Sequence, residues 1–233
     1  MPKTVDETKH AARRQMFLDC AEHLLQTVGY DRLSIQDILN ATGVSKGAFY
    51  HYFDSKQDLL EALVDQTSQA IAENLAPISD DEDLAAVEKL QRFFATLAAW
   101  KSARRDLLEN LLGVWLADEN ALLREKQRHA IARRIAPLFA RIIEQGAREG
   151  VFASSYPEQE GWLVVSIIQD LNAAMASLIV SRDPQASDQA KRLSSACQEG
   201  VARIIGIDPQ TFALVEPHLL SAWFGSSNGK DSQ

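Results

Sequence analysis

Apolar residues recur at helical spacing over most of this chain. A first helix is predicted from Asp6 to Val28, with Gly29 ending it. Its apolar face consists of Phe17, Ala21, Leu24, Leu25 and Val28. No stretch alternates apolar and polar residues as a strand would, and no internal repeat occurs. The pattern therefore predicts an all-α protein.

Three serines stand where the N-cap residues of the next helices are expected. The helices predicted after Ser34, Ser45 and Ser55 run to Gly43, to about Tyr52 and to Ala76, respectively. Asp37 follows Ser34 at the spacing of a capping box. Pro77 and the acidic run 80–83 are expected to end the third of these helices, because proline interrupts the helical hydrogen-bond ladder.

The rest of the chain is predicted to be helical as well. The expected segments are 84–100, 106–116, 119–148, 157–181, 187–205 and 208–224, the last interrupted at Pro217. Gly150 and Gly206 end two of them, and Pro157 suits the first position of its helix. The Gly/Ser-rich tail 225–233 is predicted to be disordered.

A helix-turn-helix is predicted between Leu33 and Phe53. Two short helices flank Thr42-Gly43-Val44, and Ile35, Ile38, Val44 and Phe49 are spaced to form a small shared core. The second helix would expose Lys46, Gly47, Ala48, Tyr50 and His51. A long donor beside small residues suits a helix in the major groove, with hydroxyl and imidazole groups near phosphates. A solvated Lys46 and a partly buried Tyr50 are the alternatives.

The run from Gly43 to Phe53, GVSKGAFYHYF, is followed by Lys56 and the pair Leu59-Leu60. Over residues 13–65 the chain resembles the tetracycline-repressor (TetR) family, whose usual form is GVSxGxxYxHF. Tyr52 stands where the family most often has His, and His51 precedes it. The resemblance implies a helix-turn-helix DNA-binding domain over 1–54 and a larger helical effector-binding and dimerisation domain over 55–224.

The resemblance also implies which residues meet DNA. Lys46, Gly47 and Ala48 would face base edges. The sugar-phosphate backbone would be contacted by Ser34, Ser45, Tyr50, His51, Tyr52 and Lys56. Members of the family usually bind near-palindromic operators as dimers, which places half-site centres about 34–36 Å apart. We therefore predict a homodimeric, sequence-specific repressor that a small effector releases from its operator. An activator of the same fold, or a regulator that responds to a protein partner or to no ligand, is the alternative.

Two late helices suit a dimer interface. Segment 157–181 is apolar on more than one face and carries small residues that permit close packing, and 187–205 offers an apolar stripe. The candidate interface residues are Ala173, Ala174, Ser177, Leu193, Ala196, Gly200, Val201 and Ile204. Burial of both helices inside one subunit is the alternative.

Aromatic residues gather in the middle of the second domain. The candidate effector pocket consists of Phe93, Phe94, Leu97, Trp100, Leu111, Trp115, Phe139, Trp162 and Asp170. Such a lining suits a hydrophobic or aromatic small molecule. Aromatic residues at helical spacing also pack in cores, which is the alternative for each of them.

The net charge of −8 is unevenly distributed along the chain. Residues 1–52 carry six basic and six acidic side chains, so the remainder holds the whole excess of negative charge. The negative net charge argues against a protein that binds nucleic acid nonspecifically through overall positive charge. A small DNA-reading surface needs only local basic residues, and these are present near the helix-turn-helix.

Other functional classes find little support in the sequence. No P-loop or HExxH motif occurs and the histidines are scattered, so we expect no enzyme, no metal and no cofactor. Cys20 and Cys197 lie in apolar helical patterns and are predicted to be reduced thiols. The N-terminus has no signal-peptide core. Segment 162–180 is apolar but contains Gln169, Asp170 and Asn172, so we predict a cytoplasmic protein without a membrane span.

Overall fold

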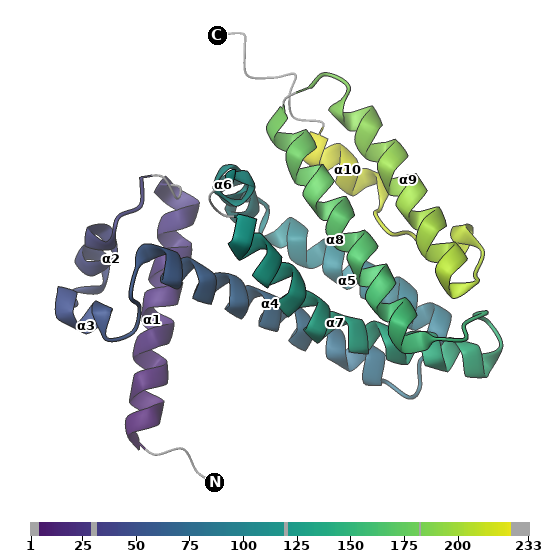
Figure 1. Cartoon of the computed structure of the whole chain (residues 1–233), viewed down its shortest axis with the longest axis horizontal. Coiled ribbons are helices and arrows are strands. Elements are labelled where there is room, and N and C mark those ends of the chain that lie inside the picture. Colours follow the sequence, from purple (N-terminus) through teal and green to yellow (C-terminus); the bar gives the residue numbers. More distant parts are fainter. Residues whose placement is uncertain (1–4, 29–31, 119–120, 182, 225–233) are drawn as a thin grey trace. The chain divides into compact units, whose positions relative to one another are not determined.

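The computed structural model describes residues 5–28, 32–118, 121–181 and 183–224, and over these residues it contains helices and no strand (Figure 1). The all-α prediction is confirmed. The predicted tail, Gly29 as a helix end and Glu119 as a helix start fall outside the described residues. The helices are α1 (Val5–Val28), α2 (Ile35–Thr42), α3 (Lys46–Tyr50), α4 (Lys56–Asp80), α5 (Ala86–Ala103), α6 (Arg105–Leu116), α7 (Ala121–Glu149), α8 (Pro157–Ser181), α9 (Ala186–Ile205) and α10 (Pro217–Phe224), with a 3₁₀ turn at Pro209–Thr211.

Local capping sets the two ends of α2. The Ser34 side chain accepts a hydrogen bond from the Asp37 backbone N–H at 3.2 Å, and the Asp37 carboxylate accepts one from the Ser34 N–H at 2.9 Å. Hydrogen bonds from the Ser34 hydroxyl and backbone hold the pKa of Asp37 below its ordinary value. Gly43 has a φ of 66°, a left-handed conformation that glycine adopts without steric cost. The predicted capping box and turn glycine are confirmed.

Helix α4 does not end at Pro77, and that prediction is wrong. The helix continues to Asp80 because its last turn is held by contacts from other helices. Ser79 is buried, and its carbonyl accepts a hydrogen bond from Lys89 Nζ at 3.0 Å. Arg141 pairs with the Asp80 carboxylate at 2.8 Å. These interactions offset the hydrogen bond that proline cannot donate.

The chain divides into two compact units, and each unit is made of two segments that are separate in the sequence. The first unit comprises Met1–Thr67 and Arg104–Arg124, and the second comprises Ser68–Ala103 and Glu125–Gln233. Helix α6 belongs to the first unit because Leu107 is buried in its core and Asn110 Nδ2 donates to the Gln26 carbonyl at 3.0 Å. The sequence predicts this segment in the second domain, because it lies within 55–224.

The core of the first unit is built on aromatic side chains from α1, α3 and the turn after α3. Phe17, Phe49 and Phe53 are almost completely buried. The Phe17 ring lies edge-on to Phe49 and to Phe53, with centroids 5.4 and 6.1 Å apart. Ile38 and Val44 pack against this cluster, as the sequence predicts. The core therefore fixes α3 against α1 and leaves the opposite side of α3 exposed.

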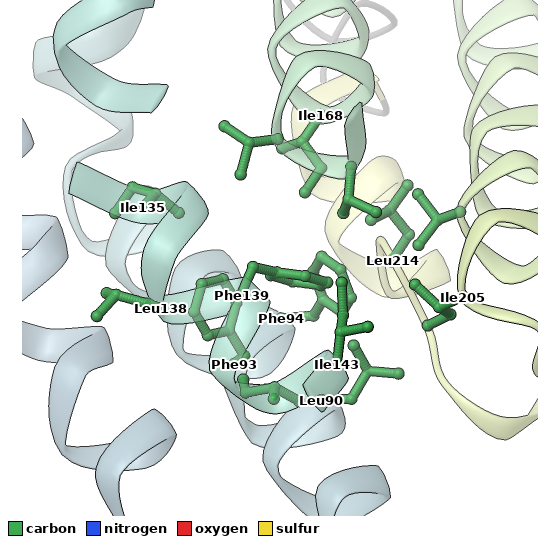
Figure 2. Packing of buried hydrophobic residues seen from close by; sticks show 14 of the residues in the cluster. Leu90, Phe93, Phe94, Ile135, Leu138, Phe139, Ile143, Ile168, Ile205 and Leu214 are labelled. Carbon is green, nitrogen blue, oxygen red and sulfur yellow. The ribbon is translucent and has the colours of Figure 1, made fainter. Parts of the chain in front are cut away.

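The core of the second unit joins α5, α7, α8 and α9. Phe93, Phe94 and Phe139 meet at its centre (Figure 2), and Phe139 lies 5.1 and 5.7 Å from the other two ring centroids. Phe94 also stacks on Phe212 with centroids 5.5 Å apart, so the segment after α9 closes one side of the core. Helices α8 and α9 run side by side (Figure 1).

By length and composition, α8 is the one described helix that could cross a membrane. Only 28% of its most apolar stretch is buried in the subunit. Arg128 binds Asp170 of this helix at 2.6 Å, and Gln169 donates to the Arg128 carbonyl at 3.0 Å. These polar contacts to α7 tie the middle of α8 into the second unit.

Candidate nucleic-acid interface

Helix α3 is short, and its start is fixed by its own side chain. Ser45 Oγ accepts a hydrogen bond from the Ala48 backbone N–H at 3.3 Å. Phe49 points into the core of the first unit and is fully buried. The helix ends at Tyr50, earlier than the predicted end near Tyr52. One face of α3 is therefore anchored, and the other is available for a ligand.

We call the side of α3 that faces away from the core, together with the residue after the helix, the α3 surface. It consists of the exposed residues Lys46, Gly47, Tyr50 and His51 and the half-buried Ala48. The Lys46 ammonium lies 5.9 Å from the Tyr50 ring centroid, and Tyr50 is 43% exposed. A Cβ added at Gly47 would meet no atom within 4 Å, so the space above its backbone is open. The surface thus combines the Lys46 ammonium, the bare backbone at Gly47 and the ring of Tyr50. This combination suits close approach to base edges.

The remaining predicted backbone-contact residues also belong to the first unit. Ser34 is exposed, while Tyr52 and Lys56 are half-buried. Tyr52 packs against Phe17 with ring centroids 5.6 Å apart, so part of its ring belongs to the core. The structure brings these residues into one unit with α3.

His10 is a candidate contact residue that the sequence did not suggest. Its ring lies 4.6 Å from the Tyr52 ring and 5.7 Å from the His51 ring, measured between centroids, and the residue is exposed. His10 precedes the core residue Phe17 by two helical turns, and that spacing places both on one side of α1. This seven-residue spacing between His10 and Phe17 is the feature of the sequence that could have identified His10 as a candidate. The imidazole of His10 therefore adds a polar group from α1 beside His51 and Tyr52.

The string Gly43–Gly47 also has the form GxSxG, which in hydrolases marks a nucleophilic serine. That serine stands on a turn between a strand and a helix. Ser45 instead lies between two helices and caps the second of them. The local structure here is that of a helix-turn-helix. Among the described residues, no group of three or more His, Cys, Asp or Glu side chains could hold a metal ion.

The predicted effector-pocket residues do not form one lining. Phe93 and Phe139 are fully buried against each other and act as core. Leu111 and Trp115 belong to the first unit. Trp162 is 41% exposed, and Asp170 is exposed and paired with Arg128.

The second unit contains a small pocket at a different position, and this pocket is open to solvent. Of the predicted residues it includes Phe94 and Leu97. The full lining is Phe94, Leu97, Ala98, Lys101, Ser102, Ile168, Leu171, Asn172, Leu214, Val215 and Trp223. Lys101 is its one ionisable side chain, and its Nζ donates to Asn172 Oδ1 at 2.7 Å. Burial among apolar groups lowers the pKa of Lys101 from 10.5 to about 8.

The predicted interface residues differ in exposure. Ala173, Ser177 and Ala196 are exposed, whereas Val201 is fully buried in the core of its own subunit and has no surface to offer a partner. The others are half-buried: Ala174, Leu193, Gly200 and Ile204. Leu193 and Ile204 pack against the core of the second unit.

Comparison with protein families gives two matches. The model for bacterial regulatory proteins of the tetR family matches residues 17–63, which include α2, α3 and the first turns of α4. The model for the tetracyclin-repressor-like C-terminal domain matches residues 116–181, which include α7 and α8. Both halves of the chain are thus recognised independently.

Individual relatives agree with these matches. The chain is 29% identical to the HTH-type transcriptional regulator YxaF of Bacillus subtilis over 70% of this chain and 84% of that protein. It is 25% identical to the nucleoid occlusion factor SlmA of Vibrio vulnificus over 75% and 87%. A TetR transcription regulator from Haloarcula marismortui shares the fold with a TM-score of 0.62 at 19% identity, over 84% of this chain and 97% of that one.

Proposed function

Because this chain belongs to the tetR family of bacterial regulatory proteins and is a DNA-binding transcriptional regulator, we propose that it represses its target genes as a homodimer on a near-palindromic operator. The observation that carries the proposal is the α3 surface, an exposed reading face held rigidly by the buried Phe49. The protein acts in the cytoplasm, where its DNA is. Activation from the same operator is the alternative outcome.

In this proposal, the residues of the α3 surface divide by role. Lys46, Gly47 and Ala48 face base edges in the major groove, and Tyr50 and His51 contact phosphates. Ser34, Ser45, Tyr52 and Lys56 contact the sugar-phosphate backbone from neighbouring positions, and His10 adds a contact from α1. Base contacts carry sequence information, whereas phosphate contacts fix the position of the protein on the duplex.

Lys46 and Lys56 should respond differently to removal of their charge. Lys46→Ala is expected to cost about 1–3 kcal/mol on the preferred operator and to relax the preference at one base pair, because a base contact discriminates between sequences. Lys56→Ala is expected to weaken all duplexes alike and to lower the salt slope by about one unit. Fluorescence anisotropy on the operator and its single-base variants, at several salt concentrations, measures both. An equal loss on all sequences for Lys46→Ala would remove this residue from base reading.

The proposed dimer is supported by the apolar surface that α8 leaves uncovered. Trp162, Ala173, Ser177 and Val180 are exposed and recur at helical spacing along this helix. Ala196 of the adjacent α9 is exposed as well. Small side chains permit close packing between helices, so two copies of the α8–α9 pair would form a four-helix interface.

Ser177→Arg is expected to weaken the dimer by at least about ten-fold in its dissociation constant. Near a two-fold axis the new side chain meets both its own copy and a close-packed helix, and like charges and steric overlap oppose association. Sedimentation velocity over a range of concentrations measures the effect. Ala95→Arg, at an exposed position of α5, adds the same charge as a control. Unchanged dimerisation of Ser177→Arg would place the interface elsewhere.

We further propose that a small molecule bound in the second unit lowers operator affinity. The chain passes between the two units three times: within α4, between α5 and α6, and near the start of α7. A ligand that changes the conformation of α5 or α7 can therefore affect the DNA-binding unit through the continuous chain. Coupling energies of about 1–3 kcal/mol are typical of such linkage.

Selection of bound sequences from a random duplex library tests the function as a whole. The expected result is an enriched palindrome with half-sites one helical turn apart, and its genomic position identifies the regulated genes. Reporter expression with and without the protein then distinguishes repression from activation. A folded dimer that enriches no sequence would contradict operator reading by α3.

A further inference from the structure

The pocket beneath α10 combines an apolar lining with one cation. Its walls come from α5, α8, α10 and the segment before α10. Lys101 and Asn172 are the polar pair in this lining, linked at 2.7 Å. The side chains that surround them are otherwise mostly hydrophobic: Phe94, Leu97, Ile168, Leu171, Leu214 and Val215.

The charge of Lys101 has no carboxylate partner in the part of the second unit that the structure describes. Among the described residues, no carboxylate forms an ion pair with its ammonium. Asp170, which directly precedes the pocket residue Leu171 on α8, is already bound by Arg128 at 2.6 Å. A half-buried ammonium with an amide oxygen as its partner retains unused donors, and a carboxylate supplies the acceptor that forms the strongest bond with it.

The walls of the pocket are held in place by backbone contacts. Gln198 of α9 donates to the Pro209 carbonyl at 2.7 Å and accepts from the Leu214 N–H at 3.1 Å. Gln91 of α5 donates to the Thr211 carbonyl at 2.7 Å. The segment that brings Leu214 and Val215 to the pocket is thus tied to two helices, and the site exists before a ligand enters.

We propose that this pocket binds an amphiphilic carboxylate, whose carboxylate group pairs with Lys101 and Asn172 and whose apolar tail lies against Leu97, Ile168 and Leu214. Lys101 Nζ donates to the ligand, and the Asn172 side-chain amide N–H donates to its second oxygen. This inference rests on the proposed function in one respect, that binding in the second unit lowers operator affinity.

The position of Lys101 explains how such a ligand acts on DNA binding. Lys101 and Ser102 belong to the last turn of α5, and α5 ends at Ala103. The chain enters the first unit at Arg104, and α6 places Leu107 in the core of that unit. A ligand that fixes the end of α5 therefore restricts the start of α6.

The affinity should depend on pH in a defined direction. Since the pKa of Lys101 is about 8, the ammonium is protonated near neutral pH and loses its proton above that value. Carboxylate affinity is expected to fall about ten-fold between roughly pH 7 and pH 9. Arg128 and Asp170 pair with each other at 2.6 Å. Burial together with the Asp170 charge raises the pKa of the Cys197 thiol, so this thiol stays neutral to a higher pH than an ordinary cysteine.

Calorimetric titration of the full-length protein with decanoate and with decanol tests the inference without DNA. Naphthoate and naphthol form a second matched pair with an aromatic tail. Both carboxylates are expected to bind at least ten-fold more tightly than their neutral counterparts. Lys101→Met should remove this preference, Lys101→Arg should retain it, and Lys191→Met, at an exposed lysine of α9, should leave it unchanged. Trp223→Phe should remove the change in tryptophan fluorescence that binding causes, because Trp223 lines the pocket.

Each outcome bears on the inference separately from the proposed function. Equal binding of carboxylate and alcohol, no binding of either carboxylate, or an unchanged preference in Lys101→Met would overturn the inference even if the operator is bound. Lys101-dependent carboxylate binding that leaves operator affinity unchanged would support the ligand class and contradict ligand-controlled release.

Discussion

Gly47→Glu is expected to abolish operator binding while leaving the protein folded. A Cβ at this position meets no atom within 4 Å, so the free protein accommodates the side chain. Within a helix, replacing glycine by glutamate even favours the helix by up to about 1 kcal/mol. On DNA the same side chain would occupy the space between α3 and the base edges, and its carboxylate would lie among phosphates.

We expect a loss of at least about 100-fold in operator affinity, which corresponds to ~3 kcal/mol. Fluorescence anisotropy with the selected operator measures the affinity, and thermal unfolding followed by circular dichroism measures the fold. Ala95→Glu, on the exposed face of α5, carries the same charge change as a control and should bind normally. Full operator affinity of Gly47→Glu would show that α3 does not enter the groove.

Phe139→Ala is expected to lower the free energy of unfolding by about 3–5 kcal/mol. Phe139 is fully buried, and its ring contacts Phe93 and Phe94 at the centre of the second core (Figure 2). Truncation removes the aromatic contacts between α7 and α5 and leaves a cavity that packed neighbours cannot fill completely. A change of this size is a large part of the stability of an ordinary domain.

Urea denaturation at one fixed protein concentration measures the effect, since association with a partner copy also stabilises the folded state. Tyr156→Ala is the matched control: Tyr156 is 69% exposed, and its removal should change the free energy of unfolding by less than about 0.5 kcal/mol. A loss below about 1.5 kcal/mol for Phe139→Ala would mean that the aromatic cluster adapts to the cavity.

The sequence by itself determined most of the helices and the helix-turn-helix. Ser34, Asp37 and Gly43 act on neighbours within a few residues, so their capping roles could be read without knowing the fold. Pro157 begins α8 as predicted. The α3 surface was predictable for the same reason, because a five-residue helix with one buried aromatic leaves few arrangements for its other side chains.

Only the tertiary structure decided where long-range contacts fall. Pro77 lies inside a helix because Lys89 and Arg141, distant in sequence, hold the turn that follows it. Helical spacing allows Phe93 and Phe139 either in a pocket or in a core, and the structure buries them against each other in the core. The pocket at Lys101 depends on Leu214 and Trp223, more than a hundred residues away. Helical spacing shows which residues share a face, but the partner of that face is set by packing between distant segments.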